Sequence, residues 1–315
     1  MANLNSSVRA GLLGGALAIF APLALAHHGA EGGHAVDGLD PTTAEKIDAA
    51  LAGDHRSDSN KARDAYRNPK ETLAFFGLRS DMSVVEISPG GGWYSEILGP
   101  VLAEDGVLYA AQYDINNTRA PFFRGAVATF LTKLVENPDV YASTKITTFD
   151  PPTPLTEAAP EPVDMVLSFR NVHNWMGGGF EADAFQAFYD ILKPGGVLGV
   201  VEHRLPEDRD QPERARTGYV KESLTIEMAE AAGFEFVAAS DVNNNPADTA
   251  DHPRGVWTLA PTLAMGDETP DGIREIGESD RYTLKFVKPQ IEAAANTPDR
   301  TARAAAPASN QGGGS

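Results

Sequence analysis

The chain has 315 residues, of which 42% are hydrophobic and 22% charged, and its formal net charge is −18. This is the composition of a globular protein, and the length suffices for one large α/β domain or two small ones. The sequence contains no cysteine, which excludes disulfides, zinc–cysteine sites and thiol nucleophiles. The acidic balance argues against nucleic acid as a partner, because phosphate backbones would be repelled.

Residues 1–26 have the pattern of a signal peptide. Arg9 gives a positive start, an apolar run extends from Gly11 to Leu25, and small residues flank a cleavage site after Ala26. A buried N-terminal helix or a membrane anchor is the alternative, but the run is short for crossing a bilayer. We therefore expect a periplasmic protein without a stable membrane anchor.

Both ends of the cleaved chain are predicted to be flexible. Residues 27–41 are rich in glycine and histidine, and residues 290–315 repeat Ala, Pro and Asn before a Gly-Gly-Gly-Ser end, which predicts a disordered tail. After cleavage, the new terminal amine and the nearby imidazoles could chelate copper. The histidines concerned are His27, His28 and His34. We expect a solvated, flexible end instead, and we assign no residue to a metal site.

Residues 42–289 are predicted to form one α/β domain. Helices are expected in pieces over 42–76, with a break at 63–69. The strands expected after them are 84–87, 107–111, 145–149, 165–169, 197–201, 234–239 and 281–287, and the helices are 126–135, 181–192 and 221–232. This alternation predicts a doubly wound parallel sheet. The last two strands have no clear helix between them, which implies an antiparallel partner.

The first strand leads into a glycine-rich turn, Ser88-Pro89-Gly90-Gly91-Gly92. An apolar strand that ends in an acidic residue, here Glu86, and enters such a turn indicates a nucleotide-cofactor site. Glycine permits positive φ and lets a ligand touch the main chain. A helix that opens at Tyr94 would point its N-terminal N–H groups at the turn. An ordinary turn is the alternative.

Six parallel strands and a reversed seventh, with an acid at the end of the first, resemble the class I S-adenosylmethionine-dependent methyltransferases. More closely, residues 50–289 resemble a bacterial group of exported predicted methyltransferases. The motifs that carry this resemblance are Arg63-Asp64 with Arg67-x-Pro69, Glu86-x-Ser-Pro-Gly-Gly-Gly-Trp, Leu192-Lys-Pro-Gly-Gly, Glu202-His203-Arg204, Asn245-Pro246-x-Asp248 and Lys285-Phe286-x-Lys288-Pro289. The resemblance implies a Rossmann-like seven-stranded sheet with a reversed last strand, preceded by helices, and S-adenosylmethionine as the cofactor.

The resemblance also implies where the cofactor lies. Its methionine part is expected against the glycine turn, with Glu86 binding the ammonium group directly or through water. The ribose is expected at Gln112, where a carboxylate is usual, or at Asp114 on the same face. The adenine is expected to stack on Phe149 and to bond to Asp150, although Asp150 could be a turn acid. The full set is Glu86, Ser88 (where a glycine is usual), Gly90, Gly91, Gly92, Gln112, Asp114, Phe149, Asp150 and Asn171.

Residues after the fourth and fifth strands are candidates for chemistry, because ligands bind at the carboxyl ends of parallel strands. The run His173-Asn174-Trp175 is similar to one that supplies the general base in many small-molecule O-methyltransferases. A histidine that packs under the next helix is the alternative. His203 and Arg204 could bind an acceptor, or Arg204 could pair with an acid. Rim candidates are Tyr219, Lys221 and Asn245, and candidates for the pocket wall or the core are Trp93, Trp175 and Tyr66.

The leading hypothesis is S-adenosylmethionine-dependent methyl transfer to an oxygen, nitrogen or sulfur atom of a small molecule in the periplasm. The alternative is a non-catalytic periplasmic binding protein that uses a degenerate methyltransferase crevice for a nucleoside-type ligand. A nicotinamide oxidoreductase fits less well. Its fingerprint requires Gly or Ala at the position of Ser95.

Overall fold

The computed structural model describes residues 38–116, 121–151, 159 and 161–290. The predicted signal peptide, the three histidines that follow it and the predicted tail from residue 291 lie outside the described residues. The predictions about those segments therefore stay predictions. Within the described residues, no helix is long and apolar enough to cross a membrane.

The helical region that the sequence predicted over 42–76 consists of four helices. They are α1 (Pro41–Ala52), α2 (Asp58–Lys61), α3 (Asp64–Arg67) and α4 (Pro69–Phe76). Asp40 caps α1, because its side chain accepts a hydrogen bond from the Thr43 N–H at 3.0 Å. The predicted break at 63–69 contains the short helix α3, and the chain turns at Asn68, where φ is 38°.

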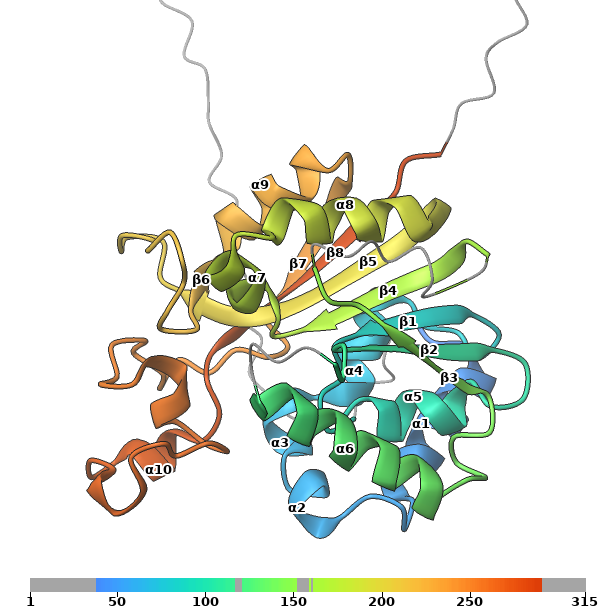
Figure 1. Cartoon of the computed structure of the whole chain (residues 1–315), viewed down its shortest axis with the longest axis horizontal. Coiled ribbons are helices and arrows are strands. Elements are labelled where there is room, and N and C mark those ends of the chain that lie inside the picture. Colours follow the sequence, from blue (N-terminus) through green and yellow to red (C-terminus); the bar gives the residue numbers. More distant parts are fainter. Residues whose placement is uncertain (1–37, 117–120, 152–158, 160, 291–315) are drawn as a thin grey trace, which may run out of the picture. The chain divides into compact units, whose positions relative to one another are not determined.

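One mixed sheet forms the centre of the described chain (Figure 1). Its strands are β1 (Ser83–Ile87), β2 (Val107–Gln112), β3 (Thr144–Thr148), β4 (Val163–Phe169), β5 (Leu192–Leu205), β7 (Glu235–Ser240) and β8 (Arg281–Val287), and the short β6 (Val220–Lys221) pairs with β5. The order is β3-β2-β1-β4-β5-β8-β7, and β8 pairs antiparallel with both of its neighbours. The predicted seven-stranded, doubly wound sheet with a reversed last strand is confirmed.

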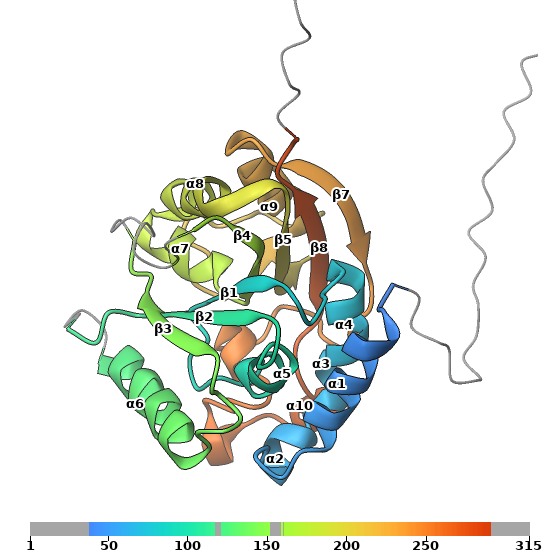
Figure 2. The same cartoon turned by 90° about the vertical axis from the view of Figure 1, so that its right-hand side faces the viewer.

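Helices cover both faces of the sheet (Figure 2). They are α5 (Ser95–Val101), α6 (Pro121–Glu136), α7 (Val172–Gly178), α8 (Glu181–Ile191) and α9 (Glu222–Ala231). The segment between β7 and β8 holds the 3-10 turns η2 (Gly255–Thr258) and η3 (Gly266–Glu268) and the one-turn helix α10 (Ile273–Ile276). Several element boundaries differ from prediction. Among them, β5 runs from Leu192 to Leu205, with Pro194 inside the strand, where 197–201 was expected. Residues 172–178, for which no helix was predicted, form α7.

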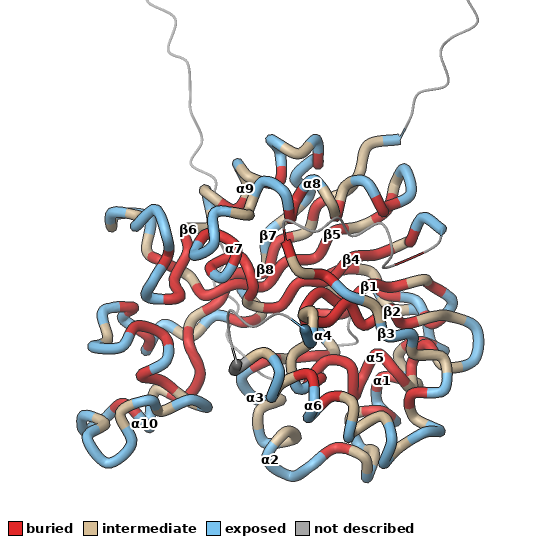
Figure 3. Tube along the Cα trace, in the orientation of Figure 1, coloured by how far each residue is buried: buried red, intermediate tan, exposed pale blue. Residues whose placement is uncertain are grey.

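The central strands are buried on both faces (Figure 3). Successive residues of a strand point to opposite faces, so Val84 packs with α1, α4 and α5, while Val85 packs with α7, α8 and α9. Both side chains have no exposed surface. These two apolar layers fix the carboxyl ends of β1, β2, β4 and β5 at one edge of the sheet, where the parallel strands end together.

Candidate functional site

The turn after β1 contains three residues with positive φ: 46° at Ser88, 60° at Gly90 and 74° at Gly92. Its start is fixed by a hydrogen bond from the Ser88 N–H to the Ala111 carbonyl at 2.8 Å. A Cβ at Gly90 would meet nothing within 4 Å, whereas one at Gly92 would lie 2.6 Å from the Phe130 ring of α6. Gly90 therefore leaves room for a ligand, and Gly92 lets α6 pack closely.

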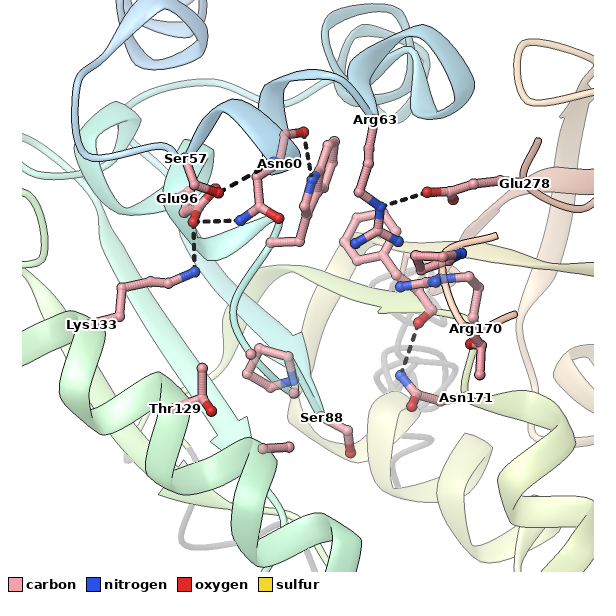
Figure 4. Close-up of a pocket in the computed structure, with 18 of the residues that line it drawn as sticks. Ser57, Asn60, Arg63, Ser88, Glu96, Thr129, Lys133, Arg170, Asn171 and Glu278 are labelled. Carbon is pink, nitrogen blue, oxygen red and sulfur yellow. Dashed lines mark hydrogen bonds and ion pairs between the residues drawn. The ribbon is translucent and has the colours of Figure 1, made fainter. Parts of the chain in front are cut away.

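A cavity of about 910 Å³ opens at this turn (Figure 4). Its walls come from the turn, the α2–α3 region, α6, the ends of β4 and β5, and the segments at 256–262 and 278–279. The sequence-predicted residues that line it are Ser88, Gly90, Gly91, Trp93, Asn171, His173 and His203. The carboxyl-end edge of the sheet thus brings six of the thirteen predicted catalytic and cofactor-binding residues, together with Trp93, to one space.

Glu86 lies behind the turn instead of in the cavity wall. Its side chain is 2% exposed, and its Oε2 accepts a hydrogen bond from the Ser95 hydroxyl at 2.6 Å. Burial raises the pKa of Glu86 to about 7, against the opposing effects of the Ser95 hydrogen bond and the Lys133 charge. Glu86 is absent from the cavity lining, so its carboxylate does not reach a ligand ammonium group directly.

Gln112 fastens the turn. Its Nε2 donates to the Gly90 carbonyl at 2.8 Å, while its Oε1 is buried and accepts no hydrogen bond from the described residues. Buried polar atoms are normally satisfied. Gln112 itself is 1% exposed and is not part of the cavity lining, so its free Oε1 is an acceptor without a partner directly behind the turn.

The other three residues expected around ribose and adenine are also not part of the lining. Asp114 accepts a hydrogen bond from the Asn116 N–H at 2.8 Å. Phe149 is 1% exposed and packs edge-on against Trp175, so it belongs to the core. Asp150 follows it directly and is half-buried.

Tyr113 is the aromatic residue that does line the cavity at this end. Its ring stacks on Phe123 with centroids 4.0 Å apart, and its hydroxyl donates to Asn171 Oδ1 at 3.3 Å. Burial raises the pKa of Tyr113 to about 12. Sequence reasoning passed over Tyr113, although its place directly after the second strand was a signal.

Asn171 joins the ends of β1 and β4. Its Nδ2 donates to the Ile87 carbonyl at 3.1 Å, and its side chain is 4% exposed. The preceding residue, Arg170, has a φ of 63°, a conformation that costs free energy for any residue other than glycine. Such strain persists where the surrounding structure demands it. Here it places the Arg170 side chain in the cavity wall (Figure 4).

His173 stands in the first turn of α7 and contacts Glu202 of β5. Glu202 Oε1 lies 3.1 Å from His173 Nδ1, and Glu202 Oε2 accepts from the His173 N–H at 3.2 Å. Glu202 has no exposed surface. A buried carboxylate at Nδ1 selects the tautomer with the proton on Nδ1, which leaves Nε2 as a proton acceptor. Glu202 stood in a motif singled out from the sequence, but no role was assigned to it.

His203 lies beside this pair. Its ring centroid is 5.5 Å from that of His173, its Nδ1 is 2.5 Å from the Ser279 hydroxyl, and its N–H donates to Glu202 Oε1 at 2.8 Å. Burial, followed by the charges of His173 and Arg170, lowers the pKa of His203 well below its usual value. His203 is therefore held neutral in a positive environment.

The other rim candidates lie outside the cavity lining. Arg204 pairs with Glu222 and with Asp280, because adjacent residues of a strand face opposite sides and only His203 faces the cavity. The other three bond elsewhere: Tyr219 to Asp248, Lys221 to the Glu207 carbonyl, and Asn245 to the Ile276 and Glu278 carbonyls. Trp175 is in the core and Tyr66 is 42% exposed.

The N-terminal helices contribute lining residues that sequence reasoning missed. Asn60 accepts at its carbonyl from the Trp93 indole N–H at 3.1 Å, and its Nδ2 donates to Glu96 at 2.8 Å. Lys133 of α6 donates to the same Glu96 Oε1 at 2.6 Å. Figure 4 shows these contacts joining α2, α5 and α6 at one side of the cavity. No sequence motif linked such distant positions.

No family model matches the sequence, and no curated protein matches it. Solved structures do show similarity. A SAM-dependent methyltransferase from Aquifex aeolicus is 14% identical, with 79% of this chain and 99% of that chain covered and a TM-score of 0.48. The [4+2]-cyclase SpnF is 15% identical over 79% and 94% of the two chains, with a TM-score of 0.49. CrArsM, an arsenic(III) S-adenosylmethionine methyltransferase from Chlamydomonas reinhardtii, is 14% identical over 79% and 74%, with a TM-score of 0.46. Similarity at this identity says nothing about the substrate.

Proposed function

We propose that this protein binds S-adenosylmethionine in the cavity and transfers its methyl group to a small molecule. One observation carries the proposal. The turn after β1 presents open backbone at Gly90 to a cavity of about 910 Å³ that also contains His173. A donor site and a proton acceptor thus share one space of the size that small ligands occupy.

The donor would be held by the residues with free capacity around the turn. Gly90 and Gly91 give access to the main chain, and the buried Gln112 supports the turn from behind by donating to the Gly90 carbonyl. Tyr113 offers an aromatic surface at the same end. Glu86 would not contact the donor, because its carboxylate is buried behind the turn and accepts a hydrogen bond from Ser95.

His173 would remove the proton from the acceptor. The sulfonium of the donor supplies an activated methyl group and a neutral thioether as the leaving group. The acceptor's proton would pass to His173 Nε2, and Glu202 at Nδ1 would stabilise the imidazolium so formed. The protein's largest contribution would be to hold the two reactants in line.

We also propose that the chain is exported and cleaved after Ala26, so that the acceptor is met in the periplasm. This proposal rests on the charged start and apolar run of residues 1–26. An exported protein would have to obtain its methyl donor outside the cytosol.

Methyl transfer is tested with methyl-labelled S-adenosylmethionine and fractionated small-molecule extracts. The expected result is labelled product together with stoichiometric S-adenosylhomocysteine, and both should depend on His173. A His173→Ala protein that forms product at the wild-type rate would contradict the proposed mechanism.

A second candidate function is binding of a nucleoside-type ligand without turnover. This candidate is favoured by Gln112, which stands where the resemblance expects a carboxylate. Gln112 is a neutral amide, and its Nε2 already donates a hydrogen bond to the Gly90 carbonyl. Tight adenosine binding without any S-adenosylmethionine-dependent product would support this candidate over catalysis.

A further inference from the structure

Four arginines surround one glutamate at the edge of the cavity. Glu278 accepts from Arg63 Nε at 2.6 Å, from Arg67 Nε at 3.0 Å and from Arg281 Nη1 at 3.1 Å. Arg170 adds a fourth charge that acts on the same carboxylate. Figure 4 shows Arg63, Arg170 and Glu278 on one side of the space. The cluster therefore carries a positive excess.

The excess positive charge shifts the pKa values of two members of the cluster. Burial alone would raise the pKa of Glu278, but the charges of Arg67, Arg281, Arg170 and Arg63 outweigh it and lower the pKa to about 2. Burial and then the neighbouring Arg170 charge lower the pKa of Arg67 well below its usual value. One carboxylate does not neutralise this group, and an additional anion would stabilise it.

Hydrogen-bonding capacity in the cluster is also unused. Arg67 is 1% exposed, its guanidinium lies 4.6 Å from the Trp93 ring centre, and its Nη1 and Nη2 have no partner among the described residues. Within those residues no hydrogen bond to the Arg170 guanidinium is found either, although its strained backbone places it in the cavity wall. Buried donors without acceptors are costly. Arg67 is not among the lining residues and contributes its charge from behind the wall, whereas Arg63 and Arg170 line the cavity, where a ligand can reach them.

The same positive field argues against a cation at the neighbouring histidines. Ligand atoms of His173, Glu202 and His203 lie within 4.8 Å of one another, a spacing that could hold a metal ion. However, the charges of Arg170, Arg281 and Arg67 all oppose added positive charge at His203. Glu202 is also already engaged by three N–H donors at 2.8 to 3.2 Å. The electrostatics of this wall favour an anion.

We propose that the methyl acceptor carries a carboxylate, which Arg63 and Arg170 bind. The planar guanidinium matches a carboxylate with two parallel hydrogen bonds. Arg170 follows β4 three residues before His173, and Glu278 precedes Ser279, the partner of His203. The charge thus lies near the histidines, which favours the acceptor over the donor as the source of the carboxylate. This inference rests on the proposed methyl transfer.

The test uses benzoate as the anionic probe and benzamide as its uncharged match, each titrated by calorimetry into protein saturated with S-adenosylhomocysteine. We expect benzoate to bind, and to bind about tenfold or more weakly to Arg170→Gln and to Arg63→Gln. Benzamide should bind equally to all forms. Arg79→Gln, at an exposed ion pair with Asp81, is the control and should bind benzoate as wild type does. Thermal melts verify that each variant is folded.

The remaining outcomes separate the sources of the carboxylate. If benzoate instead competes with S-adenosylhomocysteine, and Arg170→Gln weakens S-adenosylhomocysteine but not methylthioadenosine, the site holds the donor's carboxylate and the acceptor assignment is wrong. Equal benzoate affinity in wild type and both variants, or no benzoate binding at all, overturns the anion site. If benzoate binds wild type and S-adenosylhomocysteine does not, the anion site stands and the proposed function fails.

Discussion

Replacing Glu86 with glutamine should make the protein relatively more stable as the pH rises. The folded-state pKa of Glu86 is raised from 4.5 to about 7, chiefly by burial. The folded protein therefore holds a proton between these values that the unfolded chain has lost, so stability falls as the pH rises through this window. The difference corresponds to about 3 kcal/mol at pH 8, at about 1.4 kcal/mol per pH unit.

The Glu86→Gln variant removes this titration and retains an oxygen that can accept from Ser95. Its own buried amide costs free energy, but that cost does not change with pH. The assay is urea unfolding of both proteins, followed by circular dichroism, at pH 4.5, 6, 7 and 8. The free energy of unfolding of the variant minus that of wild type should increase by about 3 kcal/mol across this range.

An exposed glutamate provides the matched control. Glu230 lies on the solvent side of α9, and Glu230→Gln should differ from wild type by less than about 0.5 kcal/mol at every pH. If the difference between Glu86→Gln and wild type stays constant from pH 4.5 to 8, the pKa of Glu86 is the same in the folded and unfolded states, and the reasoning from its burial is refuted.

Three further predictions concern the turn, the base and the N-terminus. Gly91→Leu, whose Cβ meets only Thr129 at 3.8 Å, should abolish donor binding with little loss of stability. Gly92→Ala should instead destabilise the protein by about 1 to 3 kcal/mol, because its Cβ meets Phe130. Calorimetry and urea unfolding measure the two effects, and the reverse assignment of effects to variants would refute this prediction. His173→Ala should lower methyl transfer about 10²-fold at unchanged donor affinity, and Glu202→Gln should shift the pH–rate profile; loss of donor binding together with stability would mark a structural histidine. Periplasmic protein should begin at His27 on N-terminal sequencing, and a cytosolic product that starts at Met1 would refute export.

The fold could be predicted because its signals are local. The central strands β1, β2, β4 and β5 contain apolar runs, and the missing helix before β8 indicated the reversal that the sheet shows. Helix α7 was missed because its seven residues, rich in glycine and polar side chains, have no helical hydrophobic period. β5 began earlier than predicted because Pro194 suggested an end to regular structure.

The sequence predicted which edge of the sheet carries the cavity, but not which side chains line it. The ends of β1, β4 and β5 were correctly expected to meet, since parallel strands end at one edge. Which side chains enter the space depends on tertiary packing: Phe149 turns into the core, and Tyr113 takes the place expected of an aromatic residue. Adjacent residues of a strand point to opposite faces, so the sequence alone could have shown that His203 and Arg204 do not both face the cavity. Glu278 lies more than 200 residues from Arg63 and Arg67, and no local pattern reveals those contacts.

The most direct test of the account is calorimetric titration of S-adenosylmethionine into the wild-type protein and into Gly91→Leu. The account predicts one binding site per chain in wild type and none in the folded Gly91→Leu variant, because the leucine side chain would occupy the space at the turn. Absence of binding to wild type, or equal binding to both proteins, would contradict the claim that this cavity is a methyl-donor site.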